Sequence, residues 1–282
     1  MFLAILPFGF LKAQNNPDSL IKKQHVKEVV IRQGDRLAGD FQYDINGNLL
    51  YFRYDDFAAS TSLKVSALNI YNKDQTLLQS KSTHSSYPND TTVWNYEYDT
   101  NKNLLAIIDS KGHTVFNYRY DSLGRKVKEL MLEASGQILS ETISRYDKNG
   151  NKTDEIIKMT SLPEKVNKIY YDSLGRECKD ELIENGKMRF RTNYLYFLNT
   201  RQLIKETYDE DGDGTRLDGV IFKYDDRKRV IAKLHFNLEN GRQIITGEEA
   251  FEYFENDLIK KYSENIFTNH VKRSFDYSYN FD

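Results

Sequence analysis

The six residues Tyr120–Arg125 read Tyr-Asp-Ser-Leu-Gly-Arg, and the same six letters return unchanged at Tyr171–Arg176. Two further copies with other fillers stand at Tyr43–Asn48 and Tyr146–Asn151. An internal period of about 20–50 residues sets the architecture of a chain before any single side chain is considered. This Tyr-Asp-x-x-Gly phrase therefore decides the fold.

Degenerate copies of the phrase fill the intervals between the clear ones. The spacing of about 26 residues lies in the range of repeat arrays. The lead tyrosines are Tyr43, Tyr71, Tyr98, Tyr120, Tyr146, Tyr171, Tyr196, Tyr224 and Tyr253, and Tyr279 begins a further copy.

The residues that flank each phrase have the pattern of strands. Phe116, Tyr118 and Tyr120 alternate with polar residues, and Phe275, Tyr277 and Tyr279 do the same. Alternation of aromatic and β-branched residues with polar ones indicates a half-buried strand. Within the phrase, Asp can bind amides ahead of it and Gly can take a positive φ, which predicts a type I turn followed by a G1 bulge.

A second class of turn separates the phrases. Asn185-Gly186 and Asn240-Gly241 have the pair that suits a two-residue type I′ turn. Lys111-Gly112, Ser135-Gly136 and Pro163 stand at equivalent places. Each repeat is then one long hairpin, and we expect an all-β fold of antiparallel hairpin repeats. A meander of about 16–20 strands cannot stay flat, so we expect a long, twisted, curved or spiralling sheet.

The phrases resemble the YD-repeat (Rhs-type) proteins of bacteria, and degenerate matches extend the resemblance over residues 30–282. The resemblance implies hairpin repeats in a spiralling sheet, as in the large shells that enclose toxin domains, and an extracytoplasmic setting. It also implies carbohydrate binding, which is often proposed for this family. The chain reads as a short member without a toxin domain or an autoproteolytic motif.

Composition narrows the classes of partner. The formal net charge is −2 with 29% charged residues, which gives no electrostatic case for nucleic acid. No apolar run reaches the length of a transmembrane helix, and we expect a chain that does not span a membrane. The partner is expected to be a protein or a polysaccharide at the cell surface.

The N-terminal segment lacks the repeat phrase and is considered separately from the repeats. Residues 1–13 form an apolar stretch that resembles a signal peptide cleaved after Ala13, although no basic residues precede it; a buried first strand is the alternative. Residues 14–40 are expected to form a cap segment, with a short helix over 18–25 and a first strand over 26–32. Residues 41–282 form the repeat domain. Export to the periplasm, the outer surface or the medium follows from the signal.

One acidic loop has no counterpart in other copies. Asp209, Asp211 and Asp213, with Gly214 after them, match the first half of a calcium loop. The second half departs from that pattern, and Asp218 is the candidate that closes the site. A solvated acidic turn is the alternative. Calcium is the one cofactor that the sequence suggests.

The aromatic rungs form the second candidate site. Trp94 and Tyr96 lie on one face of a predicted strand, and Tyr194 and Tyr196 lie on one face of another. Such rungs could stack sugar rings, and cross-strand aromatic packing is the alternative.

No constellation of catalytic residues accompanies the repeats. The histidines lack metal-ligand spacing, and the sequence has no nucleophile elbow or phosphate loop. We therefore expect an exported, non-enzymatic repeat protein that serves as a binding or scaffold surface, through a sheet face or exposed edge strands. The alternatives are a carbohydrate-binding module and a fragment or accessory of an Rhs-type toxin system.

Overall fold

The computed structural model describes residues 17–56, 63–84, 87–197, 200–207, 216–267 and 270–281. These residues form one short helix and twenty strands, which confirms the all-β prediction. The elements in chain order are α1 (Pro17–Lys23), β1 (Val26–Gln33), β2 (Arg36–Tyr43), β3 (Leu49–Asp56), β4 (Leu63–Tyr71), β5 (Leu77–His84), β6 (Tyr87–Tyr98), β7 (Leu104–Asp109), β8 (Thr114–Tyr120), β9 (Lys126–Leu132), β10 (Ile138–Tyr146), β11 (Lys152–Met159), β12 (Leu162–Tyr171), β13 (Glu177–Glu184), β14 (Lys187–Phe197), β15 (Thr200–Thr207), β16 (Arg216–Tyr224), β17 (Val230–Glu239), β18 (Arg242–Tyr253), β19 (Ile259–Ile266) and β20 (Val271–Phe281).

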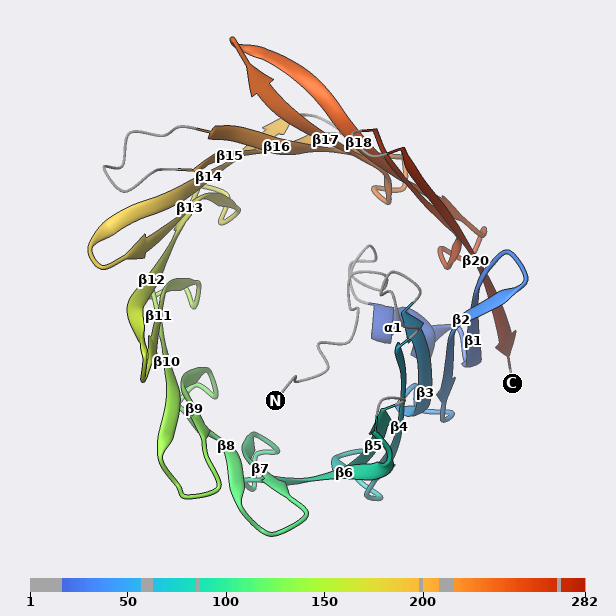
Figure 1. The fold of residues 1–282 in the computed structure, drawn as a ribbon, viewed down its shortest axis with the longest axis vertical. Coiled ribbons are helices and arrows are strands. Elements are labelled where there is room, and N and C mark those ends of the chain that lie inside the picture. Colours follow the sequence, from blue (N-terminus) through green and yellow to red (C-terminus); the bar gives the residue numbers. More distant parts are fainter. Residues whose placement is uncertain are drawn as a thin grey trace. The chain divides into compact units, whose positions relative to one another are not determined.

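Successive strands pair antiparallel in every hairpin whose register is described, as the meander predicts. The first strand is paired on both sides, because β1 bonds to β2 and also to β20. Figure 1 shows the N-terminal strands beside the last one. β1 and β20 are therefore each paired on both sides and do not offer the exposed edges that strand addition requires. Long-range pairing of Val29 with Tyr279 supplies the partner that a local pattern cannot reveal.

The chain divides into two compact units. The first comprises Met1–Thr91, Phe222–Leu234 and Ile245–Asp282, and the second comprises Thr92–Ile221 and His235–Ile244. Among the described residues, no helix is long and apolar enough to cross a membrane.

An aromatic cluster forms the core of the first unit. Phe41 of β2 faces Phe52 of β3 in the register, and their rings stack with centroids 6.4 Å apart. On β18 to β20, Tyr262 lies between Phe251 and Phe275, with centroid distances of 5.2 Å and 5.9 Å. Aromatic pairs across strands stabilise a sheet by about 0.2–1 kcal/mol each, relative to alanine pairs. Tyr and Phe contribute six of the fourteen buried residues of this cluster, and the other eight are aliphatic.

Helix α1 packs against the first unit at two turns. Its Ile21 is buried in the core cluster. A Cβ atom added at Gly47 would stand 2.8 Å from the Cβ of Lys22, so the helix lies directly on the first Tyr-Asp turn. Just after the helix, the Gln24 side chain donates to the Asn256 carbonyl at 3.5 Å. The expected cap segment, 14–40, thus contributes α1, β1 and most of β2, while residues 1–13, the expected signal peptide, lie outside the described residues.

Charges set the register in the second unit. Six residues that face one another across β10 to β15 alternate in sign: Arg145, Asp154, Lys168, Glu181, Arg191 and Glu206. Residues directly opposite in a sheet share a face, and each opposite-charge pair contributes about 0.2–1 kcal/mol. A slip of one residue would move every side chain to the other face of the sheet. Because β10 to β15 contain no buried large apolar residue among those described, this charged row is what favours one register there.

The Tyr-Asp-x-x-Gly phrase forms the predicted turn. In the repeat at Tyr120, the Gly124 amide donates to the Asp121 carbonyl at 3.0 Å, and Gly124 has a φ of 74°. Where a copy lacks glycine, another residue takes the positive φ, as Lys102 and Asp257 do. The same backbone turn therefore persists in the degenerate copies, at the cost of a conformation that non-glycine residues seldom adopt.

The second class of turn is confirmed only in part. Asn185 and Gly186 both have positive φ, as a type I′ turn requires. Gly112 instead donates to the Asp109 carbonyl at 3.1 Å, and Gly136 donates to Glu133 at 2.8 Å, so these turns match the Tyr-Asp geometry. Asparagine adopts a left-handed φ more readily than lysine or serine does, which favours the type I′ turn at Asn185. Pro163 lies inside β12 rather than in a turn.

Candidate functional site

The aspartate of each Tyr-Asp turn organises the loop that follows it. In the repeat at Tyr120, one carboxylate oxygen of Asp121 accepts from the Leu123 and Arg125 amides, at 3.0 Å and 2.9 Å. A side-chain oxygen accepts the same pair of backbone bonds in seven other turns, where it belongs to Asp44, Asn72, Asp99, Asp109, Asp147, Asp172 and Asp225. These side chains therefore hold the backbone of their own turns in place, as the sequence predicts.

The fifth residue after the tyrosine completes the turn. This role was not predicted from the sequence. Arg125 Nε donates to the second oxygen of Asp121 at 2.7 Å. Asn103 and Asn151 make the corresponding bond to Asp99 and Asp147. The backbone and side-chain bonds from Arg125 lower the pKa of Asp121 below its ordinary value.

In seven described copies, the lead tyrosine ties the repeat to the one before it. The Tyr171 hydroxyl donates to the Lys152 carbonyl at 2.9 Å, and Lys152 is the first residue of the strand that leaves the preceding turn. The same bond joins successive repeats at six further places: Tyr71 to Leu49, Tyr120 to Leu104, Tyr146 to Lys126, Tyr196 to Glu177, Tyr253 to Val230 and Tyr279 to Ile259. Tyr279 thus begins a true copy.

Arginine closes the connection in three repeats. The Arg125 guanidinium lies over the Tyr146 ring at 4.7 Å, Arg176 over Tyr196 at 4.2 Å, and Arg229 over Tyr253 at 4.7 Å. Each of these arginines also pairs with the aspartate of its own turn. We call this Asp–Arg–Tyr connection between neighbouring repeats the turn latch. Its sequence signal is arginine directly after the glycine position.

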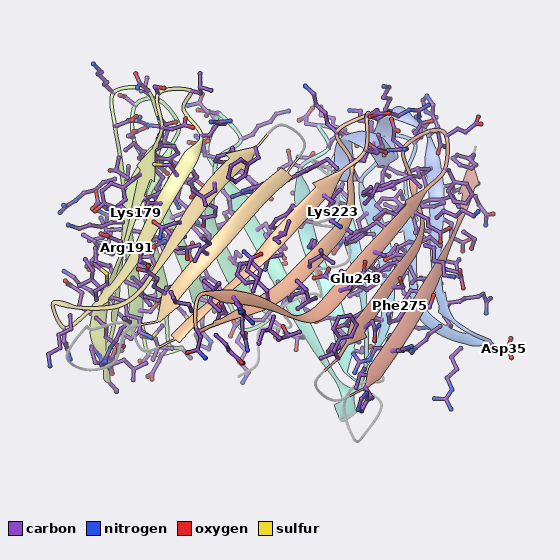
Figure 2. All side chains as sticks on the ribbon, turned by 90° about the horizontal axis from the view of Figure 1, so that it is seen from above. Asp35, Lys179, Arg191, Lys223, Glu248 and Phe275 are labelled. Carbon is purple, nitrogen blue, oxygen red and sulfur yellow. The ribbon has the colours of Figure 1, made fainter. Side chains whose placement is uncertain are left out.

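A buried carboxylate marks the charged row in the second unit. The side chain of Glu181 is 8% exposed and accepts from the Tyr170 hydroxyl at 2.9 Å and from Arg191 at 3.1 Å. Lys179 pairs with it at 3.1 Å and lies near Arg191 (Figure 2). Burial raises the pKa of Glu181, but these three donors outweigh it and hold the pKa below its ordinary value. The carboxylate is saturated with partners, as a structural charge should be.

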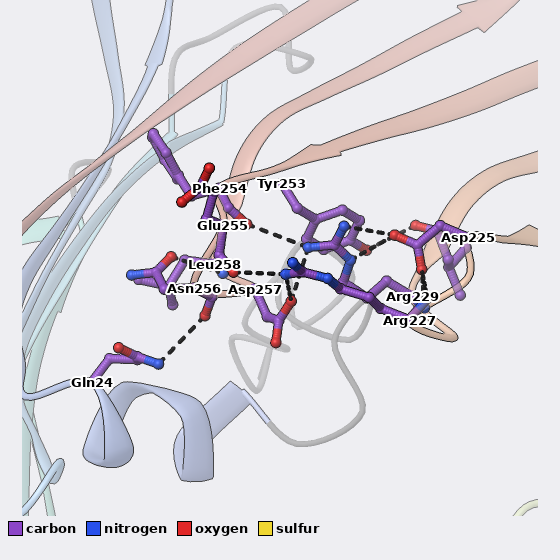
Figure 3. A network of polar contacts seen from close by, with 11 residues as sticks. Gln24, Asp225, Arg227, Arg229, Tyr253, Phe254, Glu255, Asn256, Asp257 and Leu258 are labelled. Atoms are coloured by element: carbon purple, nitrogen blue, oxygen red, sulfur yellow. Dashed lines mark hydrogen bonds and ion pairs between the residues drawn. The ribbon is translucent and has the colours of Figure 1, made fainter.

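The copy that begins at Tyr253 departs from the latch. Phe254 stands where most other turns have aspartate, and Leu258 stands where they have arginine or another polar residue. The backbone turn still forms, because the Phe254 amide donates to the Leu258 carbonyl at 2.8 Å. Asp257, at the glycine position, instead pairs with Arg229 of the preceding copy at 2.9 Å (Figure 3).

A pocket opens beside this altered turn. Its volume is about 430 Å³, and it is lined by Phe254, Glu255, Asn256, Leu258, Tyr279 and Phe281. Phe254 meets Tyr279 edge to face with ring centroids 6.0 Å apart. Half of Phe281 is exposed, whereas Leu258 is buried. An aromatic pocket with few polar groups is the general form of a small-ligand site.

The predicted calcium loop falls mainly outside the described residues. Asp209, Asp211 and Asp213 all lie there, so calcium binding stays a prediction. Asp218 belongs to β16. Within the described part of the chain, no group of three acidic, histidine or cysteine side chains is placed to hold a metal ion.

The four predicted stacking residues lie in two separate strands. Trp94 and Tyr96 belong to β6, and Tyr194 and Tyr196 belong to β14. The Tyr194 hydroxyl donates to Asp180 at 2.6 Å, and the Arg201 guanidinium lies over its ring at 4.7 Å. Tyr196 belongs to a turn latch. Both tyrosine rings of β14 are thus engaged within the protein, and sugar stacking stays a prediction.

Comparison with known sequences finds a distant relative. No protein-family profile matches the chain. Over 143 residues, half of this chain, it is 28% identical to the tRNA3(Ser)-specific nuclease WapA of Bacillus spizizenii. The matched part spans 6% of that nuclease's length. The match supports a loose relationship to Rhs-type repeat proteins.

Comparison with solved structures finds β-rich proteins at low similarity. A porin-like protein from Bacteroides uniformis aligns over 90% of this chain and 98% of its own, with 7% identity and a TM-score of 0.39. The TcdB2-TccC3-Cdc42 structure aligns over 89% of this chain and 18% of its own, with 11% identity and a TM-score of 0.27.

Proposed function

We propose that this chain is an exported, non-enzymatic repeat protein that presents a binding surface to a partner at the cell envelope. The observation that carries the proposal is the turn latch. Aspartate, arginine and tyrosine side chains, which often serve in active sites, here bind one another from repeat to repeat. A group that recurs with the same partners in three repeats serves the architecture of the sheet, and the repeats together form a scaffold.

Export is supported by residues 1–13, a mainly apolar stretch that ends in the small residue Ala13, as a cleaved signal peptide does. Cell fractionation of the full chain and of a variant lacking residues 2–13 tests it in a bacterial host. We expect the full chain outside the cytoplasm, shortened at its N-terminus, and the variant inside. Equal distribution of the two proteins would contradict export.

The non-enzymatic role has its own test, because the distant relative is a nuclease. The purified chain is incubated with tRNA, and the products are separated by gel electrophoresis. We expect intact tRNA, since the region shared with that relative covers a small part of its length and the described side chains serve the latches. Cleavage that copurifies with the folded protein would overturn the proposal.

A further inference from the structure

The turn that precedes Tyr279 differs from the three turns that place an arginine over the next tyrosine. In three other repeats, the tyrosine of the next copy lies under an arginine of the preceding turn, at 4.2–4.7 Å. For Tyr279, that preceding turn supplies Leu258 instead of arginine and Phe254 instead of aspartate. Both members of the Asp–Arg pair are thus replaced by apolar residues at one place, and the described pocket lies there.

The pocket combines aromatic rings with negative charge. Phe254, Tyr279 and Phe281 contribute three rings, and Glu255 contributes the one ionisable carboxylate of the lining. The lining contains no lysine or arginine. Among the described residues, the Glu255 side chain has no ion-pair partner, whereas Asp257 next to it is occupied by Arg229. Arg227 and Arg229 donate to the Glu255 and Phe254 carbonyls, at 2.8 Å and 3.3 Å, and Figure 3 shows both arginines on the side of the turn away from the Phe254 ring.

Aromatic rings with a nearby carboxylate suit one chemical class of ligand. The face of an aromatic ring attracts a cation, and cages of several rings recognise quaternary ammonium groups. We propose that this pocket binds a small organic cation of the alkylammonium type, held by the rings of Phe254, Tyr279 and Phe281 and by the charge of Glu255. The bound cation takes the role that an arginine of the chain fills in three other repeats. This inference deepens the proposed binding role, and its test is independent of export and of nuclease activity.

The test compares choline with its neutral isostere 3,3-dimethylbutan-1-ol. Binding of each to the full chain is followed by ligand-observed NMR over a concentration series. We expect choline to bind, and the isostere to bind at least about fivefold more weakly, because it lacks the cation–π attraction. Equal affinities would show a merely apolar pocket and would overturn the proposal, as would failure of choline to bind.

Variants locate the site. Glu255→Gln removes the charge on an exposed side chain and should weaken choline binding about fivefold, while the exposed Glu252→Gln, outside this pocket, should not change it. Phe281→Ala should weaken binding to a similar degree. Unchanged binding in both pocket variants would place the ligand elsewhere and refute the assignment.

A restoration variant gives the sharpest result. Phe254→Asp with Leu258→Arg rebuilds the Asp–Arg pair, and the new arginine should cover Tyr279 and exclude choline. Because Leu258 is buried, the urea midpoint of this variant is measured beside its binding. Folded protein that still binds choline as the wild type does would also refute the proposal.

Discussion

Arg125 lies 4.7 Å from the centroid of the Tyr146 ring and at the same time donates to Asp121, so one guanidinium joins two successive repeats. Arg125→Lys keeps the charge but loses the planar fork that fits both partners. We expect the free energy of unfolding to fall by about 0.5–1 kcal/mol from the weaker contact with the ring. Urea unfolding measures it. Arg119→Lys, at an exposed residue of β8, is the control and should change little. Equal effects would mean that the latch adds nothing.

The tyrosine hydroxyls make the second connection between repeats. Tyr171→Phe removes the donor to the Lys152 carbonyl and leaves that carbonyl without its partner. We expect a loss of about 1 kcal/mol in the free energy of unfolding, the usual contribution of one such bond. Tyr51→Phe is the matched control, because its hydroxyl has no hydrogen-bond partner among the described residues. A loss at Tyr51 as large as that at Tyr171 would contradict the assignment.

The turns were predictable because their chemistry is local. Asp121 and Gly124 act on amides within the same loop, so the phrase alone indicates the type I turn and its bulge. The turn at Gly112 could have been recognised from Asp109, which stands at the same spacing as the aspartate of the phrase. Its place along the chain, midway between two phrases, instead suggested a type I′ turn.

The latches and the β1–β20 pairing were not predictable from local pattern. The bond from Tyr171 to Lys152 joins residues in different repeats, and the pairing of Val29 with Tyr279 joins the two ends of the chain. Such contacts depend on the stacking of hairpins, which repeat spacing does not fix. The one sequence feature that indicates the pocket beside Phe254 is the absence of aspartate and arginine from their usual positions in that copy.

Helix α1 provides a test of how closely the N-terminal segment packs. Gly47 and Gly150 both have positive φ, at 80° and 89°, so alanine is strained at both. Only at Gly47 would the new methyl group meet the helix, 2.8 Å from Lys22 Cβ, whereas nothing lies within 4 Å at Gly150. We expect Gly47→Ala to lower the free energy of unfolding by about 1–3 kcal/mol more than Gly150→Ala does.

Amide hydrogen exchange shows whether the loss is local. Protection of residues 17–25 should fall in Gly47→Ala and stay unchanged in Gly150→Ala, because the clash displaces α1. Equal losses of stability with unchanged protection of the helix would show that α1 does not rest on this turn.

Buried tyrosines predict a steep loss of stability at alkaline pH. Burial raises the pKa of Tyr253 to about 12, from an ordinary value of 10.0, and burial raises the pKa values of Tyr277 and Tyr279 as well. Below pH 10, both the folded and the unfolded chain keep these protons, and the contribution to stability is complete. As the pH rises from 10 toward 12, the unfolded chain releases protons that the folded chain retains, so stability falls.

Urea unfolding between pH 8 and pH 12, with tyrosinate absorbance read in parallel, measures this loss. We expect the buried tyrosines to ionise together with unfolding, above pH 10, while exposed ones ionise earlier. Tyr253→Phe removes one of the raised pKa values, so the slope of stability against pH should become shallower, even though the variant loses the bond to Val230 and is less stable at pH 8. Ionisation of every tyrosine near pH 10 in a chain that stays folded would contradict the burial from which the prediction follows.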